Sequence, residues 1–335
     1  MSKKYTSTRL ADYENWLKDG APNPLNRISD CTLLLEKPDL IEGAEPFSLE
    51  LGMTEPSEQA FCQWYGAHAF KGWGEWVELG SFLGSLTVPG VRGLRVNPSK
   101  TAAAHKIRVY DLFRWNSMMV EFADYYEIKD APTEGTWYIQ YYKDYNAHVL
   151  DRVEVTQADL TRRDYSGEPI EFLVIDVMKY PALVTNILRE FFPSLRAGSL
   201  VFHQDYLHFY EGWITLSMYQ MQDCFKFRSA LPEGDTVIFE ATQSPNPEKL
   251  EFLANNEELT VELINDAFDW SRSVIPEAHH HQVDATQCMM YYHAGHHDEC
   301  RALYQQLATR HSYPSSLADL KAYLENNKLF SLQEN

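Results

Sequence analysis

The sequence predicts an α/β domain in which a mostly parallel sheet is covered by helices on both faces. Short apolar runs alternate several times with segments of helical periodicity, a pattern typical of parallel strands joined by crossover helices. Several of these runs end at a glycine or an acid, so polar residues would gather at one edge of the sheet. The composition, 44% apolar and 23% charged over 335 residues, is that of a globular protein.

The helix expected first covers residues 58–71, where apolar residues recur at helical spacing. Five strands are expected after it, and a helix over 180–192 separates the last two of them. Right-handed crossovers would bring the carboxyl ends of the strands to one edge, where such sheets bind ligands. The expected strands cover residues 75–80, 106–111, 152–156, 171–176 and 199–204.

The pattern changes after the fifth strand. A helix is expected over 213–222, followed by two strands over 224–231 and 236–242, which a Pro-Glu-Gly-Asp turn would join into a hairpin. This antiparallel pair would close one edge of the sheet. The predicted fold is therefore a doubly wound, Rossmann-like sheet of seven strands.

Beyond Pro245 and Pro247 the signals are helical. The stretch 291–304, with Gly295 at a turn and Pro314 after it, is similar to one unit of a tetratricopeptide repeat, and a single unit predicts no solenoid. This part is a candidate surface for homodimerisation or docking. The expected domains are a loosely helical or extended lead-in (1–57), the sheet domain (58–244) and an all-α appendage (245–335).

Charge and cysteine content limit the classes of partner. The net charge is −19 and no run rich in Lys or Arg occurs, which argues against nucleic acid and anionic membranes as partners. No apolar stretch is long enough to span a membrane, and the first residues do not resemble a signal peptide. Five scattered cysteines without a CxxC pair favour reduced thiols and a cytoplasmic location.

A glycine turn follows the first strand, in Val77-Glu-Leu-Gly-Ser-Phe-Leu-Gly84. Glycine is needed where backbone approaches a ligand closely or takes a positive φ. The three-glycine dinucleotide fingerprint is absent, which argues against NAD and FAD, and no phosphate-binding loop with a lysine occurs. Taken alone, the motif is equally compatible with an ordinary turn from strand to helix.

Four successive strands each bring an acid to the ligand edge of the sheet, namely Glu78, Asp111, Asp159 and Asp176. Since parallel strands share one carboxyl edge, these side chains would face the same ligand. The carboxylate of Asp111 could accept hydrogen bonds from the two vicinal hydroxyls of a ribose.

With these motifs the chain resembles the class I S-adenosylmethionine-dependent methyltransferases, in particular the sugar and macrolide O-methyltransferases and, more distantly, the catechol O-methyltransferases. The resemblance covers residues 47–242. It implies that Glu78 and the turn bind the methionine part of S-adenosylmethionine through Gly80, Ser81 and Gly84, that Asp111 binds ribose, and that Phe113 and Asp159 flank adenine. One departure is the stretch after the turn, where Pro89 and two glycines should weaken the expected helix.

The resemblance also implies a metal site and a base. Catechol-type relatives have D-x-x-K at one strand end and Asp-Asn at the next, sugar-type relatives have Asp-Asp-Tyr there, and this chain has Asp176-Val-Met-Lys179 and Gln204-Asp205-Tyr206. The oxygens of Asp176, Gln204 and Asp205 would suit Mg²⁺ or Mn²⁺. His203 is the candidate general base, with Lys179 as the alternative if its pKa is lowered. His203 could equally be a core residue, and Lys179 a solvated lysine at a helix start.

Two further groups of residues leave alternatives open. From Phe113 to Tyr145, 10 of 33 residues are aromatic; they could form a lid in which Tyr141, Tyr142 and Tyr145 stack on a substrate ring, or they could pack into the core. His293 with His297, and His296 with Cys300, have a spacing that could hold zinc, but no further pair completes such a site and a solvated turn is favoured.

The leading hypothesis is an O-methyltransferase that uses S-adenosylmethionine, assisted by a divalent cation, to methylate a hydroxyl of a small molecule such as a sugar or a secondary metabolite. An alternative is a non-catalytic protein that keeps the fold and binds a partner through its helical C-terminal part. A third reading is a zinc enzyme built on the C-terminal histidines.

Overall fold

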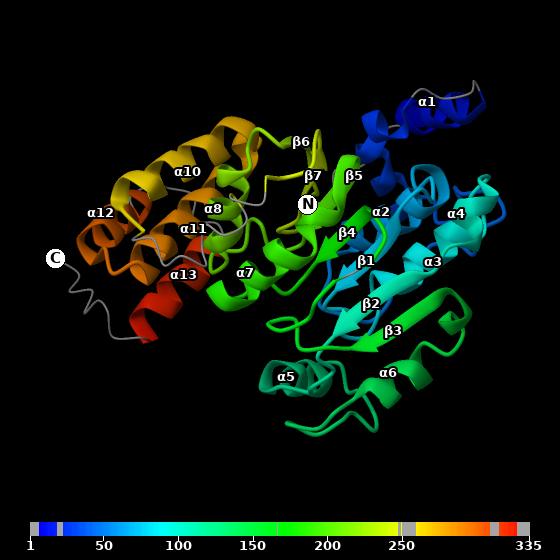
Figure 1. Ribbon diagram of the computed structural model, residues 1–335, viewed down its shortest axis with the longest axis horizontal. Coiled ribbons are helices and arrows are strands. Elements are labelled where there is room, and N and C mark those ends of the chain that lie inside the picture. Colours follow the sequence, from blue (N-terminus) through cyan, green and yellow to red (C-terminus); the bar gives the residue numbers. More distant parts are fainter. Residues whose placement is uncertain are drawn as a thin grey trace. The chain divides into compact units, whose positions relative to one another are not determined.

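The fold is described from a computed structural model, in residues 7–18, 23–165, 167–246, 249, 259–308 and 315–326 (Figure 1). The chain forms two units. One consists of Met1–Asp176 with Leu231–Gly234, and the other of Val177–Ala230 with Asp235–Asn335. The predicted domain boundaries at 57 and 244 remain a prediction.

Four parallel strands form the centre of the first unit. In the order β3-β2-β1-β4, each strand pairs in parallel with its neighbour (Figure 1). Val77, for example, lies opposite Arg108 on one side and Leu173 on the other. Their apolar side chains are almost all buried, as expected for strands covered on both faces. The strands are β1 (Glu75–Leu79), β2 (Ile107–Asp111), β3 (Val153–Gln157) and β4 (Ile170–Ile175).

Helices of the first unit precede, connect and follow these strands. The predicted helix over 58–71 is α2, which starts at Pro56 because Glu55 and Glu58 form a capping box there. Between residues 7 and 55, the described part of the lead-in contains one α-helix and one 3₁₀ helix, and residues 36–55 form neither helix nor strand. The helices are α1 (Ser7–Lys18), η1 (Pro24–Leu35), α2 (Pro56–His68), α3 (Thr87–Arg95), α4 (Lys100–Ala104), α5 (Ser117–Tyr125), α6 (Ile139–Tyr145) and η2 (Leu150–Arg152).

The helix after the glycine turn is better formed than predicted. Pro89 is the third residue of α3, within the first turn, where a backbone N–H has no partner inside the helix. The two glycines allow close packing: a Cβ on Gly93 would lie 2.1 Å from the carbonyl oxygen of Gln63 in α2, and one on Gly90 would lie 2.9 Å from the ring of Trp76. These residues therefore let α3 approach α2 and β1 closely.

The described residues of the second unit form three strands and several helices. β7 pairs antiparallel with β6, as the predicted hairpin required, and it also pairs antiparallel with β5. β5 starts four residues before its predicted start at 199. Its elements are α7 (Pro181–Glu190), η3 (Phe192–Ser194), β5 (Leu195–His203), α8 (Gly212–Gln220), β6 (Phe225–Ala230), β7 (Val237–Ala241), α10 (Val261–Val274), η4 (Glu277–His279), α11 (His280–His293), α12 (His297–Ala308) and α13 (Ser315–Asn326).

The strand order, β3-β2-β1-β4-β5-β7-β6, confirms the predicted fold class. It is a sheet of seven strands, mostly parallel with an antiparallel edge, followed by a helical C-terminal part, and it is the fold that the resemblance to class I methyltransferases implies. Gly295 lies at the turn between α11 and α12 with φ +80°, as predicted. Pro247 and Pro314 lie outside the described residues. Within the described ranges, every helix is too short or too polar to cross a membrane.

Candidate functional site

The glycine turn directly follows β1. Gly80 and Gly84 have φ values of +82° and +87°, which explains why glycine stands at both positions. Between them Phe82 also has a positive φ, +46°, although it carries a side chain. Such a conformation persists in a residue with a Cβ only when neighbouring contacts hold it.

Asp111, at the end of β2, provides those contacts. One carboxylate oxygen accepts the backbone N–H groups of Ser81 at 2.9 Å and Phe82 at 3.1 Å, and the other accepts that of Phe113 at 2.6 Å. Burial raises the pKa of Asp111, and the three hydrogen bonds oppose that rise. A carboxylate has about four acceptor positions, so one remains for a ligand in this conformation.

Glu78, at the end of β1, lies beneath the turn and is 1% exposed. One of its oxygens accepts a hydrogen bond from the Thr87 hydroxyl at 2.7 Å, and the Ser81 hydroxyl lies 3.0 Å from Thr87 and 3.1 Å from that of Tyr142. The other oxygen, Oε1, has no hydrogen-bond partner among the described residues. Burial raises the pKa of Glu78 to about 7, because desolvation outweighs the hydrogen bonds it accepts.

Two more buried polar atoms near Tyr142 have no hydrogen-bond partner in the described part of the chain. They are Oδ1 of Asn146, whose amide nitrogen donates to the carbonyls of Leu83 and Tyr142, and the hydroxyl of Tyr138. A buried polar atom left unpaired costs about 1–3 kcal/mol, so such atoms are candidates for binding a polar ligand. Two acceptors and a hydroxyl around one turn fit a polar, cationic ligand. Sequence reasoning missed Asn146 and Tyr138.

The two residues expected at adenine have different environments. Phe113 is fully buried, and its ring lies 5.4 Å from that of Tyr138 and 5.1 Å from that of Tyr142. Asp159 is exposed, and its carboxylate accepts hydrogen bonds from the backbone and hydroxyl of Thr161. Phe113 is linked to the turn, because Asp111 accepts backbone hydrogen bonds from both. The Asp159 side chain bonds Thr161 and stabilises its own loop. The contacts of Phe113 and Asp159 with adenine remain predictions.

In the second unit, His203 is fully buried among aromatic rings, with Phe192, Tyr206 and Phe239 at 6.3–6.4 Å between centroids. Neither ring nitrogen has a hydrogen-bond partner among the described residues. Burial lowers the pKa of His203 to about 3, so the ring stays neutral. This placement corrects the prediction of His203 as general base and supports the alternative of a core residue, because a base must reach its substrate.

The predicted metal ligands are divided between the units: Asp176 belongs to the first, and Gln204 and Asp205 to the second. The carboxylate of Asp205 forms an ion pair with the ammonium group of Lys179. Among the described residues, no cluster of three or more His, Cys, Asp or Glu side chains could hold a metal ion. The predicted magnesium site is therefore not found there, since an internal ammonium binds one of its carboxylates.

Lys179 and Asp205 also influence Glu211, a residue that sequence reasoning missed. Burial raises the pKa of Glu211 to about 8, with Lys179 lowering it and Asp205 raising it further. The ammonium group of Lys179 is engaged by the carboxylate of Asp205, and its role as a general base remains a prediction.

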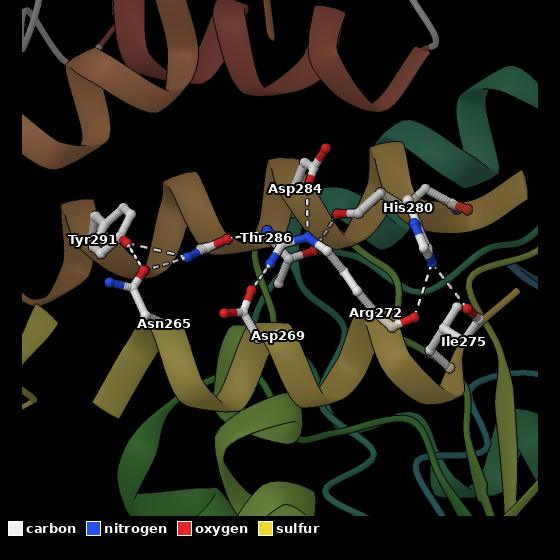
Figure 2. A network of polar contacts seen from close by, with 10 residues as sticks. Asn265, Asp269, Arg272, Ile275, His280, Asp284, Thr286 and Tyr291 are labelled. Atoms are coloured by element: carbon white, nitrogen blue, oxygen red, sulfur yellow. Dashed lines mark hydrogen bonds and ion pairs between the residues drawn. The ribbon is translucent and has the colours of Figure 1, made fainter. Parts of the chain in front are cut away.

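Two histidines of the C-terminal part, His280 and His296, bond backbone carbonyl groups. His280 bonds the carbonyl oxygens of Arg272 and Ile275, both at 3.0 Å, next to the ion pair between Arg272 and Asp284 (Figure 2). His296 bonds the carbonyl oxygen of Leu259 at 2.6 Å. These contacts join α10 to α11 and hold the start of α12. Among the described residues, no group of three or more His, Cys, Asp or Glu side chains supports the alternative of a zinc site at His293, His296, His297 and Cys300.

Comparisons with known proteins give no family model and no curated protein that matches this chain. Solved structures do match. The O-methyltransferase NovP is 13% identical with a TM-score of 0.42, over 65% of this chain and 98% of its own. The mitomycin 7-O-methyltransferase MmcR is 14% identical (TM-score 0.34; 56% and 53% covered), and a methyltransferase from Geobacter sulfurreducens is 14% identical (TM-score 0.33; 71% and 98% covered). At such low similarity, the residues of this chain must decide its chemistry.

Proposed function

We propose that the chain is an S-adenosylmethionine-dependent methyltransferase that binds its cofactor at the glycine turn. The observation that carries the proposal is the carboxylate of Glu78, which is buried under the turn with one oxygen unpartnered in the described structure. A buried acid in this state is stabilised as an anion by a cation. S-adenosylmethionine carries an ammonium and a sulfonium group, and so provides one.

The surrounding residues have complementary roles in this proposal. Gly80 and Gly84 allow the backbone to approach the methionine part, and Asn146 Oδ1 accepts a hydrogen bond from its ammonium group. Asp111 accepts one ribose hydroxyl at its remaining acceptor position. When bound, the cofactor supplies a methyl group on a good leaving group, and the protein's main task is to align it with the acceptor oxygen.

The proposed acceptor is a hydroxyl group of a small molecule, a sugar or a secondary metabolite. The residues present do not fit the predicted divalent cation, because Asp205 is paired with Lys179. No part of the proposal therefore depends on a metal.

Calorimetric titration with S-adenosylmethionine tests the proposal. The wild type should bind, and Glu78→Gln and Asp111→Asn should each weaken binding by about tenfold or more, since each removes a charge-assisted hydrogen bond. Glu134→Gln, at an exposed glutamate, is the matched control and should bind like the wild type. Absence of binding heat for the wild type at millimolar cofactor would refute the proposal.

A second candidate, a non-catalytic binding protein with the same fold, is favoured by one observation. Asp111 already accepts three backbone N–H groups, and Phe113 and Tyr142 are fully buried beside it. If this arrangement is rigid, little room is left for ribose. The same titration separates the candidates, because a scaffold of this kind should bind no cofactor in either wild type or variants.

A further inference from the structure

A hollow of about 730 Å³ opens in the first unit, and it is not one of the features that the sequence predicted. Residues 49–56, which lead into α2, form one wall, and three aromatic residues from α5 and its end, Phe122, Tyr125 and Tyr126, form the other. This volume lies within the range of about 300–1,000 Å³ typical of small-molecule sites.

Both walls are attached to the glycine turn and the residues that follow it. On one side, the Thr54 hydroxyl bonds the Ser85 hydroxyl at 2.9 Å. On the other, the ring of Phe122 packs edge-on against that of Phe82, at 5.2 Å between centroids. The hollow therefore lies next to the turn at which the cofactor is proposed to bind.

The aromatic wall continues outward from Phe82. The rings of Phe122 and Tyr126 are 4.6 Å apart, and those of Tyr126 and Tyr125 are 4.9 Å apart. Tyr125 is 80% exposed and Tyr126 52% exposed, although large aromatic side chains are usually buried. Neighbouring exposed tyrosines at the edge of a hollow can stack on a ligand ring and bond its hydroxyl groups.

The charge of the residues that line the hollow indicates which charge a ligand can carry. Of the described residues that line the hollow, two are acidic, Glu50 and Glu55, and none is basic. Arg92, the nearest cation shown to contact this wall, is bound to Glu50 at 2.5 Å. An anionic ligand would meet acids without a free countercharge, so phosphates and carboxylates are disfavoured. Peptide groups of the loop and tyrosine hydroxyls are suitable partners for ligand hydroxyls.

We propose that this hollow binds a neutral ring compound that carries hydroxyl groups, a phenol or an aryl sugar, and that this compound is the methyl acceptor. The acceptor role rests on the proposed methyltransferase function, whereas the binding does not. In this arrangement Tyr125 and Tyr126 set the specificity for a ring. Tyr125 and Tyr126 take the place of Tyr142 as the residues that stack on the ligand ring, because Tyr142 is fully buried.

Fluorescence anisotropy of two related probes tests the inference. 4-Methylumbelliferyl β-D-glucoside is neutral, and 4-methylumbelliferyl phosphate has the same ring with an anionic group. The wild type should bind the glucoside at least about tenfold more tightly than the phosphate. Tyr125→Ala and Tyr126→Ala should each weaken glucoside binding by about fivefold, the loss of one aromatic contact.

Trp73→Ala is the matched control, because Trp73 is an exposed aromatic residue of the same unit that precedes β1 at the opposite end of the strand. It should bind the glucoside like the wild type, and thermal unfolding should show that all three variants are folded. The inference is overturned if the wild type does not bind the glucoside, if it binds the phosphate equally well, or if the tyrosine variants bind like the wild type. If the protein binds the glucoside but not S-adenosylmethionine, only the proposed methyltransferase function is refuted. If it binds S-adenosylmethionine but not the glucoside, only the inference about the hollow is refuted.

Discussion

Replacing Glu78 with glutamine should make the protein more stable at high pH, relative to the wild type. Burial raises the pKa of Glu78 from 4.5 to about 7, so between these values the folded protein holds a proton that the unfolded chain has lost. This group's contribution to stability therefore falls as pH rises from 4.5 through 7. The gap corresponds to about 3 kcal/mol at a pH above both values.

Glutamine has the shape of the protonated acid and can still accept the hydrogen bond from Thr87. Urea unfolding at about pH 5 and about pH 8.5 gives the stability difference between variant and wild type. Relative to the wild type, Glu78→Gln should gain about 3 kcal/mol in free energy of unfolding between the lower and the higher pH. For the exposed control Glu134→Gln the stability difference should not move. An equal difference at both pH values for Glu78→Gln would show that the reasoning about this buried acid is wrong.

Three further outcomes are expected. Gly93→Ala should destabilise the protein by about 1–3 kcal/mol in urea unfolding, because its Cβ would meet the backbone of α2. A gain of up to about 1 kcal/mol, which helix propensity alone would give, would contradict the packing argument. His203→Leu should gain stability over the wild type as pH falls from 6.5 towards about 3, since His203 takes up a proton in this range only in the unfolded wild type; thermal melts check this. Methyl transfer by the variant should persist in an activity assay. Lys179→Met should lose stability relative to the wild type as pH rises through about 8, because removing the ammonium group raises the pKa of Glu211 further. A loss of stability that is the same at every pH in thermal melts would contradict this expectation.

Most of the strands could be predicted from the sequence because they are short runs rich in apolar residues, and three of them, over 75–80, 106–111 and 171–176, end at a glycine or an acid. β1 to β4 start and end within one residue of the predicted bounds. The start of β5 was missed by four residues, since Arg196, Ala197 and Gly198 carry no apolar pattern yet belong to the strand. The helix α3 was underrated because Gly90 and Gly93 were judged by propensity, whereas close packing against α2 and β1 decides.

The candidate site was predictable only where it lies on strand ends. Glu78 and Asp111 were found because parallel strands bring their carboxyl ends together. Asn146 was missed because it follows α6, far along the chain, and nothing local marks an asparagine that will bond Leu83. The magnesium ligands were chosen for their oxygen atoms, but the sequence does not show that a nearby lysine ammonium takes up Asp205.

The aromatic segment shows why composition alone could not decide between lid and core. Tyr142 is buried and bonds the Ser81 hydroxyl within the turn, whereas Tyr125 is exposed at the hollow. Phe82 connects the two environments: its backbone N–H bonds Asp111, and its ring contacts Phe122. The backbone at Phe82 is left-handed, a conformation that glycine adopts more easily than a residue with a side chain. Glycine at this position could not make the ring contact with Phe122. The same residue thus couples the conformation of the turn to the wall of the hollow.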